Sequence, residues 1–180
     1  MRSATAVSPS VYPNRAILAL GSNVGNWKLN FNQCLKKISN FGLITRIGNI
    51  YVSKPYGHIQ QKKFHNTAIE LMTNHSPLKL MRGLQLVEKV LKKNKTITNG
   101  PRRIDIDIVF YNQLVFQNNQ LTIPHPRAFK RDFVLYPIND IDPFYFHPTK
   151  HKTIKVLIEG LNEKYIEKVI KQPRDSLLIH

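Results

Sequence analysis

The strongest chemical signal in this sequence is a pair of aspartates two residues apart, preceded by two arginines. The segment reads Gly-Pro-Arg-Arg-Ile-Asp-Ile-Asp-Ile-Val over residues 100–109. Because side chains on a β-strand alternate between its faces, Asp105 and Asp107 would project to the same side, with Cα atoms ~6–7 Å apart. Two such carboxylates supply the hard oxygen ligands that Mg²⁺ prefers, and arginines suit phosphoryl groups. The pattern therefore predicts a metal–nucleotide site.

The same segment also has a purely structural interpretation. Alternating polar and apolar residues are typical of a half-buried strand, in which Ile104, Ile106 and Ile108 would face a core. Aspartate is depleted in strands, however, and two aspartates on one face repel each other unless a positive group lies between them. Together with the Gly-Pro-Arg segment before it, this favours a functional site.

Five short blocks, including this one, follow one another in a defined order. They are Leu-Gly-Ser-Asn at 20–23, Phe-His-Asn-Thr-Ala at 64–68, the block at 100–109, Leu-Thr-Ile-Pro-His-Pro-Arg at 121–127 and Arg-Asp-Phe-Val-Leu at 131–135. In this order and spacing they resemble the 6-hydroxymethyl-7,8-dihydropterin pyrophosphokinase family of folate biosynthesis. The resemblance implies transfer of pyrophosphate from ATP to 6-hydroxymethyl-7,8-dihydropterin, giving AMP, with two Mg²⁺ ions bound together with ATP.

The resemblance also implies roles for individual residues. The two Mg²⁺ ions would be held by Asp105 and Asp107. The catalytic residues would be Arg102, Lys93, Asp105 and Asp107. The pterin would be bound by Phe64, Asn66, Phe133 and Asp105, with the two rings clamping its flat faces. ATP would be bound by Gln85, Glu88, Lys95, Ile108, Thr122, His125 and Arg131.

The sequence departs from the family in the segment that precedes Gly100. The family commonly has an arginine-rich stretch ending in Arg-Trp there, whereas residues 92–99 read Lys-Lys-Asn-Lys-Thr-Ile-Thr-Asn. Lys93 and Lys95 replace arginines, which keeps the charge but loses the bidentate guanidinium geometry. We expect a mobile lid that closes over the nucleotide. An alternative function is therefore a homologue that binds pterin or ATP with weakened catalysis.

Composition indicates an anion-binding protein. The formal net charge is +16, which favours anionic partners. A basic ferredoxin-like module that binds RNA is a further alternative, but neither central strand carries the aromatic and basic pattern of such modules, so no nucleic acid is expected. The single cysteine, Cys34, suits a reducing cytoplasm. No apolar run approaches the ~18–20 residues of a membrane span, and we expect a monomer.

A small α+β domain must position these residues. The expected strands cover 15–20, 43–53, 64–73 and the aspartate pair; one helix ends near residue 40 and a second starts at Ser76-Pro77. Gly21-Ser22-Asn23 is interpreted as a turn that supports the site. The order β-α-β-β-α-β predicts a ferredoxin-like core with a C-terminal helical/hairpin extension. We expect a flexible extension at 1–14, a single pyrophosphokinase domain at 15–170 and a tail at 171–180.

Overall fold

A central antiparallel sheet with helices on both faces forms the protein. The computed structural model describes residues 12–57, 60–91 and 101–173. The strands are β1 (Asn14–Ser22), β2 (Leu43–Ile47), β3 (Ile50–Ser53), β4 (Phe64–Thr73), β5 (Asp105–Tyr111), β6 (Phe116–Gln117), β7 (Thr122–Ile123) and β8 (Ile166–Ile170). The helices are α1 (Trp27–Ile38), α2 (Pro77–Leu91), α3 (Asp132–Ile141) and α4 (Ile154–Glu159), with short 3₁₀ turns η1 (Ser39–Phe41) and η2 (Ala128–Lys130).

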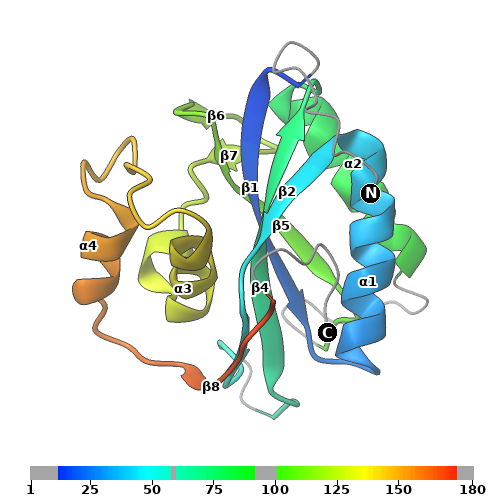
Figure 1. Cartoon of the computed structure of the whole chain (residues 1–180), viewed down its shortest axis with the longest axis vertical. Helices are drawn as coiled ribbons and strands as arrows, with labels where there is room; N and C mark the ends of the chain where they lie inside the picture. The colour runs from blue at the N-terminus through cyan, green and yellow to red at the C-terminus, as the bar shows by residue number, and fades with distance from the viewer. Residues whose placement is uncertain (1–11, 58–59, 92–100, 174–180) are drawn as a thin grey trace, which may run out of the picture.

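The main sheet separates two helical layers. Within the described residues its strand order is β5-β1-β4-β3-β8, with β2 beside β4, while β6 and β7 form a separate hairpin. Every pairing is antiparallel. Figure 1 shows α1 and α2 on one side of the sheet and α3 and α4 on the other. The α+β class predicted from the sequence is confirmed.

Both early helices form where the sequence pattern predicts them. Helix α1 is capped by Asn26, whose side chain accepts a hydrogen bond from the Leu29 N–H at 3.1 Å. Cys34 lies on the buried side of this helix and is fully buried. Helix α2 begins at Pro77 and buries Leu80 at its first turn. In the described part of the chain, no helix has the length and apolar character to cross a membrane.

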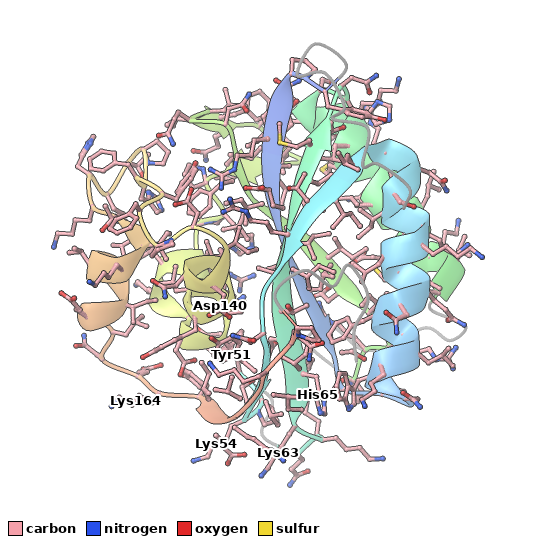
Figure 2. All side chains as sticks on the ribbon, in the orientation of Figure 1. Tyr51, Lys54, Lys63, His65, Asp140 and Lys164 are labelled. Atoms are coloured by element: carbon pink, nitrogen blue, oxygen red, sulfur yellow. The ribbon has the colours of Figure 1, made fainter. Side chains whose placement is uncertain are left out.

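The single strand expected over 43–53 is wrong, because the chain bends in its middle and forms β2 and β3. A Cβ atom on Gly48 would lie 2.6 Å from the carbonyl oxygen of Pro137 in α3, so the backbones approach closely here. Asp140 of the same helix accepts hydrogen bonds at 2.9 Å from the Asn49 N–H and the Tyr51 hydroxyl. Figure 2 labels Tyr51 and Asp140 where the sheet meets α3. Contact with α3 therefore accounts for the bend.

The two faces of the sheet carry different side chains. Along β1, Ala16, Leu18 and Leu20 belong to the core beneath α1 and α2, whereas Ile17 belongs to the core beneath α3 and α4. The isoleucines predicted to point into a core do so: Ile104, Ile106 and Ile108 are 0%, 8% and 5% exposed and lie in the α1/α2 core. The aspartates of β5 must therefore project toward the α3 side.

Candidate active site

The floor of the candidate site is formed by three neighbouring strands on the α3 side of the sheet. Asn66 of β4, Gly21 of β1 and Asp105 of β5 are register partners in one row, and Ala19 lies beside Asp107 two residues along. A Cβ atom on Gly21 would lie 3.5 Å from Asn66 Oδ1 and 4.0 Å from Asp105 Cβ. The small residues of β1 therefore leave open the space between the amide and the carboxylate, and both predicted aspartates face this space.

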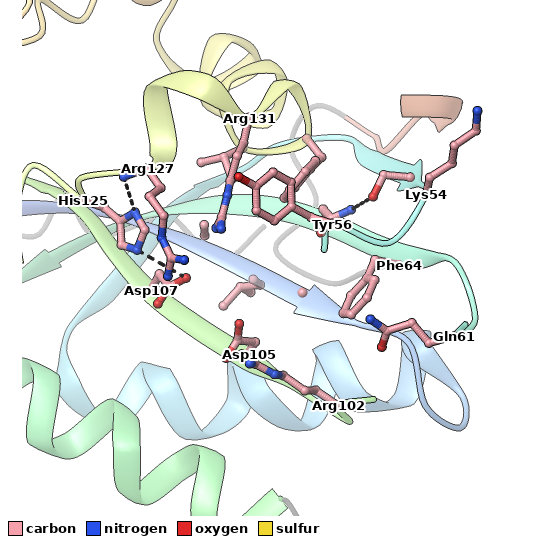
Figure 3. A pocket seen from close by; sticks show the side chains of 17 residues that line it. Lys54, Tyr56, Gln61, Phe64, Arg102, Asp105, Asp107, His125, Arg127 and Arg131 are labelled. Carbon is pink, nitrogen blue, oxygen red and sulfur yellow. Dashed lines mark hydrogen bonds and ion pairs between the residues drawn. The ribbon is translucent and has the colours of Figure 1, made fainter. Parts of the chain in front are cut away.

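Aromatic side chains from separate segments form the walls. Phe64 comes from the start of β4 and Phe133 from the first turn of α3, and both line a cavity of about 180 Å³ above the floor. Tyr56, from the loop before β4, lines it too, with its ring centroid 6.3 Å from that of Phe133. The Arg131 guanidinium lies 4.4 Å from the Tyr56 ring centroid. Figure 3 shows Phe64, Tyr56 and Arg131 around this cavity.

Basic side chains surround the aspartate pair. Arg102 Nη1 lies 2.6 Å from Asp105 Oδ1, and His125 Nε2 lies 4.0 Å from Asp107 Oδ2. Burial by the surrounding protein raises the pKa of Asp107, and the charge of Asp105 raises it further. His125, followed by Arg131 and Arg102, acts in the opposite direction on the pKa of Asp107. The site thus holds two repelling carboxylates that a bound cation would stabilise.

The hydrogen bonds of His125 fix which of its nitrogens faces the aspartates. Its Nδ1 accepts the Arg127 N–H at 3.3 Å, so the neutral ring carries its proton on Nε2, the atom nearer Asp107. Burial lowers the pKa of His125, while Asp107 opposes the shift. The neutral form therefore presents an N–H donor to the cavity.

Asn66 is held by the sheet and also faces the cavity. The side chain is 7% exposed, and its Nδ2 donates to the Tyr51 carbonyl at 3.1 Å and to Ser53 Oγ at 3.0 Å. Its Oδ1 is the atom nearest to a Cβ built on Gly21. The Nδ2 group of Asn66 therefore binds other parts of the sheet, whereas its Oδ1 lies at the cavity floor.

A second cavity, of about 330 Å³, lies along the outer edge of β5. The predicted ATP-binding residues that line it are Gln85, Glu88, Ile108, Thr122 and His125. Glu88 Oε1 also accepts the Ile106 N–H at 2.7 Å, which anchors α2 to this edge. Asp105 and Asp107 line both cavities, whereas Arg131 lines the first. The two spaces therefore meet at the aspartates.

Asn23 joins three segments that carry site residues. Its Oδ1 accepts the Arg102 N–H at 2.7 Å, and its Nδ2 donates to Gln61 Oε1 at 3.2 Å and to the Lys62 carbonyl at 3.1 Å. Asn23 is 6% exposed. The turn predicted over Gly21-Ser22-Asn23 is wrong for its first two residues, because they pair with β4 and form the end of β1. Asn23, directly after the strand, holds the arginine next to Asp105, a role that turn propensity alone does not reveal.

The donor set fits a magnesium–nucleotide complex. Among the described residues, no group of three or more His, Cys, Asp or Glu side chains converges as a potential metal site. The protein would therefore offer the oxygens of Asp105 and Asp107, which line both cavities. Mg²⁺ is usually held by one or two carboxylates, with substrate phosphates and water completing its octahedron.

Comparison with known proteins identifies the family. The model of the 7,8-dihydro-6-hydroxymethylpterin-pyrophosphokinase (HPPK) family matches residues 17–143. The chain belongs to this family. The 2-amino-4-hydroxy-6-hydroxymethyldihydropteridine pyrophosphokinase of Aquifex aeolicus is 36% identical over 138 residues, which cover 77% of this chain and 86% of that protein. The folic acid synthesis protein FOL1 of Dictyostelium discoideum is 38% identical over 140 residues.

HPPK relatives are often longer than this chain. The match covers 78% of this chain but only 21% of the Dictyostelium discoideum protein, and 22% of the folic acid synthesis protein of Pneumocystis carinii. A crystal structure of Plasmodium falciparum HPPK-DHPS has a TM-score of 0.68 with 17% identity, covering 82% of this chain and 41% of that chain. The structural likeness shows that the fold is shared.

The sequence predicted some of the residues that line the two cavities, and others were not predicted. Of the predicted residues, Lys93 and Lys95 lie outside the described residues. Among the residues that line the first cavity but were not predicted, those with polar or aromatic side chains are Ser53, Lys54, Tyr56, Gln61 and Arg127. Most of these lie in loops without periodicity. The Pro-Arg dipeptide after His125 was the one signal that could have indicated Arg127.

Proposed function

We propose that the protein transfers a pyrophosphoryl group from ATP to 6-hydroxymethyl-7,8-dihydropterin, giving AMP and the pterin diphosphate. The observation that carries the proposal is the meeting of two cavities at Asp105 and Asp107, one walled by aromatic rings and one running along α2 and β5. Membership of the HPPK family and the activity for which the Aquifex aeolicus relative is named support the same reaction.

The first cavity is the proposed pterin site. A flat heteroaromatic ring can stack on aromatic side chains, and Phe64 and Phe133 both line this cavity, from separate segments of the chain. Asn66 Oδ1 lies at the floor, where it would accept a hydrogen bond from a ring N–H or amino group. Asp105, in the same row of the sheet, would lie near the hydroxymethyl end.

The second cavity is the proposed ATP site. It is lined by Gln85 and Glu88 of α2, Thr122 of β7 and Ile108 of β5. Because β5 is the last strand on this side of the sheet, its backbone edge would offer polar groups to a base. The phosphates would extend toward the aspartates, where both cavities meet. Lys93 and Lys95, outside the described residues, remain predicted to add charge over the nucleotide.

The chemistry requires positioning and charge neutralisation. The pterin hydroxyl oxygen forms a bond to the β-phosphorus as the bond from that phosphorus to the bridging oxygen breaks, that oxygen leaves with AMP, and the hydroxyl proton is released to solvent. Mg²⁺ ions, two in the family resemblance, would neutralise phosphate charge when held by Asp105 and Asp107. Arg102 and Arg131 would bind phosphate oxygens. No nucleophile from the protein is needed.

His125 would add a neutral donor to this charged environment. With Nδ1 accepting from the Arg127 backbone, Nε2–H points toward the region of Asp107. A phosphate oxygen bound there would replace the longer, 4.0 Å approach to the carboxylate.

The remaining expectations stand as proposals. The order β5-β1-β4-β3, with β2 and β3 acting as one bent strand, supports a ferredoxin-like core. A single domain at 15–170, a monomeric state and a cytoplasmic location are predictions that follow from the sequence.

The decisive experiment supplies ATP, Mg²⁺ and the hydroxymethyl pterin and measures AMP by chromatography. We expect AMP to form in proportion to pterin consumed, and to be absent when pterin or Mg²⁺ is left out. ADP as the product would overturn pyrophosphoryl transfer. Binding of both ligands by calorimetry without AMP would instead support the alternative of a catalytically weakened homologue.

A further inference from the structure

A buried carboxylate outside the proposed catalytic set lies directly behind the proposed pterin wall. Asp132 is 2% exposed and begins α3, one residue before Phe133. Its Oδ1 accepts the Phe133 N–H at 2.6 Å. Its Oδ2 accepts two further backbone N–H groups, from Tyr165 at 2.7 Å and from Ile166 at 2.9 Å. One carboxylate thus binds the wall residue and the start of β8 together.

The start of β8 is also fixed to the rim of the same cavity. The Tyr165 carbonyl accepts the Lys54 N–H at 3.0 Å, and Lys54 lines the cavity. Pairing of β8 with β3 continues this connection into the main sheet. Residues 165–166 therefore lie between Asp132 on one side and Lys54 on the other.

The Tyr165 ring supports the aromatic wall from behind. It lies edge-on to the Phe133 ring, with centroids 5.8 Å apart and planes at 89°. Its centroid is also 5.4 Å from that of Tyr56, which itself contacts Phe133. Edge-to-face contacts of this kind fix ring orientation. The orientation of Phe133 thus depends on the residue that directly precedes β8.

We propose that Asp132 is a positioning residue for pterin binding, and that the C-terminal strand is part of the pterin site through it. The inference rests on the proposed function, because it assumes that Phe133 stacks on a pterin. It extends the site to residues 165–166, beyond the segment 17–143 that matches the family. A wall that is held before the ligand arrives loses less freedom on binding.

The test compares Asp132→Asn with Asp140→Asn in the full chain. Both carboxylates lie on α3 and both accept hydrogen bonds from other segments, but Asp140 binds Asn49 and Tyr51, away from Phe133. For Asp132→Asn we expect the Kd and KM for the pterin to rise on the order of tenfold, since stacking contributes at that scale. The KM for ATP should stay unchanged. Asp140→Asn should lower the Tm without altering the pterin KM.

A second variant tests the proposal should Asp132→Asn fail to fold. Tyr165→Ala keeps the backbone bonds to Asp132 and removes the supporting ring, together with the hydrogen bond from its hydroxyl to Glu163, and it should also weaken pterin binding selectively. Calorimetry with pterin alone and with an ATP analogue alone gives both affinities. Wild-type pterin affinity in folded Asp132→Asn, or in Tyr165→Ala, would overturn the inference while leaving the function intact. A wild-type protein that binds no pterin would overturn both.

Discussion

The two faces of the sheet use similar strands for opposite purposes. The face beneath α1 and α2 is a continuous apolar core, in which Leu18, Leu20 and Ile106 are almost fully buried. The other face is apolar only beneath α3 and α4. Beyond the apolar part that contains Ile17, this face carries Asn66, Asp105 and Asp107, and it opens into the cavities.

The difference shows how one strand can serve both stability and function. In β5 the isoleucines face the α1/α2 core while the aspartates, one residue away in each case, face the site. Burial of the neighbouring isoleucines thus fixes the strand so that the two carboxylates stay close together. Substitutions on the core face should change stability, and substitutions on the site face should change activity or ligand affinity.

The largest effect is expected on the site face. Asp107→Asn keeps the size of the side chain but removes a metal-ligand charge, so AMP formation should fall on the order of a thousandfold, which corresponds to several kcal/mol. The Tm should stay the same or rise, because the repulsion with Asp105 is relieved. Steady-state rates at saturating Mg²⁺ and thermal unfolding measure both. Near-normal activity would contradict the assignment, and Asp140→Asn serves as a control.

Substitutions on the core face should lower stability and leave the KM values unchanged. Leu80 is fully buried in the α1/α2 core, so Leu80→Ala should lower the free energy of unfolding by about 2–5 kcal/mol. The KM values of the folded protein should not change. Leu86→Ala on the same helix, where the side chain is 61% exposed, is the matched control. A selective change in KM with unaltered stability would break the distinction between the two faces.

The part of the α3 side that does not open into the cavities contains a buried histidine. Protonation of this histidine should affect the stability of the fold. His147 is 2% exposed, and its Nδ1 accepts the Lys150 N–H at 3.3 Å. Burial, and secondarily the charge of Lys150, lowers the pKa of His147 from 6.5 to about 4. The unfolded state therefore binds more protons within this window, and stability should fall as the pH drops from about 6.5 to about 4.

The size of this pH effect can be isolated with a variant. His147→Gln removes the titration, so its Tm should fall less steeply over that pH range than the Tm of the wild type. Over the same pH range, the wild type should lose ~2–3 kcal/mol more free energy of unfolding than the variant. Identical pH profiles for the two proteins would show that His147 titrates normally in the folded state.

The smallest effects are expected from alanine substitutions at two glycines, one of which should affect pterin affinity and the other stability. A Cβ atom on Gly21 makes only ordinary contacts, the nearest at 3.5 Å, whereas one on Gly83 of α2 would lie 2.3 Å from Phe41 Cε1. Gly21→Ala should keep or slightly raise the Tm and weaken pterin affinity by about 1 kcal/mol or less. Gly83→Ala should lower stability by ~1–3 kcal/mol without changing pterin affinity. The reverse pattern in calorimetry and thermal unfolding would contradict the comparison.

The sequence predicted features that depend on local periodicity. The common face of Asp105 and Asp107, the strand over Phe64–Thr73 and the start of α2 at Pro77 follow from patterns within a few residues, and the structure agrees. The fold class followed from the order of these elements. Residues from distant blocks do line common cavities, although their roles remain predictions.

Features that depend on contacts between distant segments were not predictable. The bend at Gly48 arises where α3 presses on the strand, and no local pattern marks that contact. The triple connection made by Asn23 and the placement of Tyr56 likewise depend on how loops meet. Asp132 reads in the sequence as an ordinary helix-start residue; only the structure reveals its partners on β8.

The exposed edge of β5 has a consequence for self-association. Strand β5 ends the sheet on one side, and unpaired edge amides can recruit another chain as an extra strand, leading to aggregation. Here Glu88 accepts the Ile106 N–H, and the His125 N–H donates to the Val109 carbonyl at 3.0 Å. Helix α2 and the segment at His125 thus each bind part of the β5 edge. The second cavity, which both of them line, remains open to a small ligand. The surface that would admit a nucleotide is thereby closed to a second β-strand.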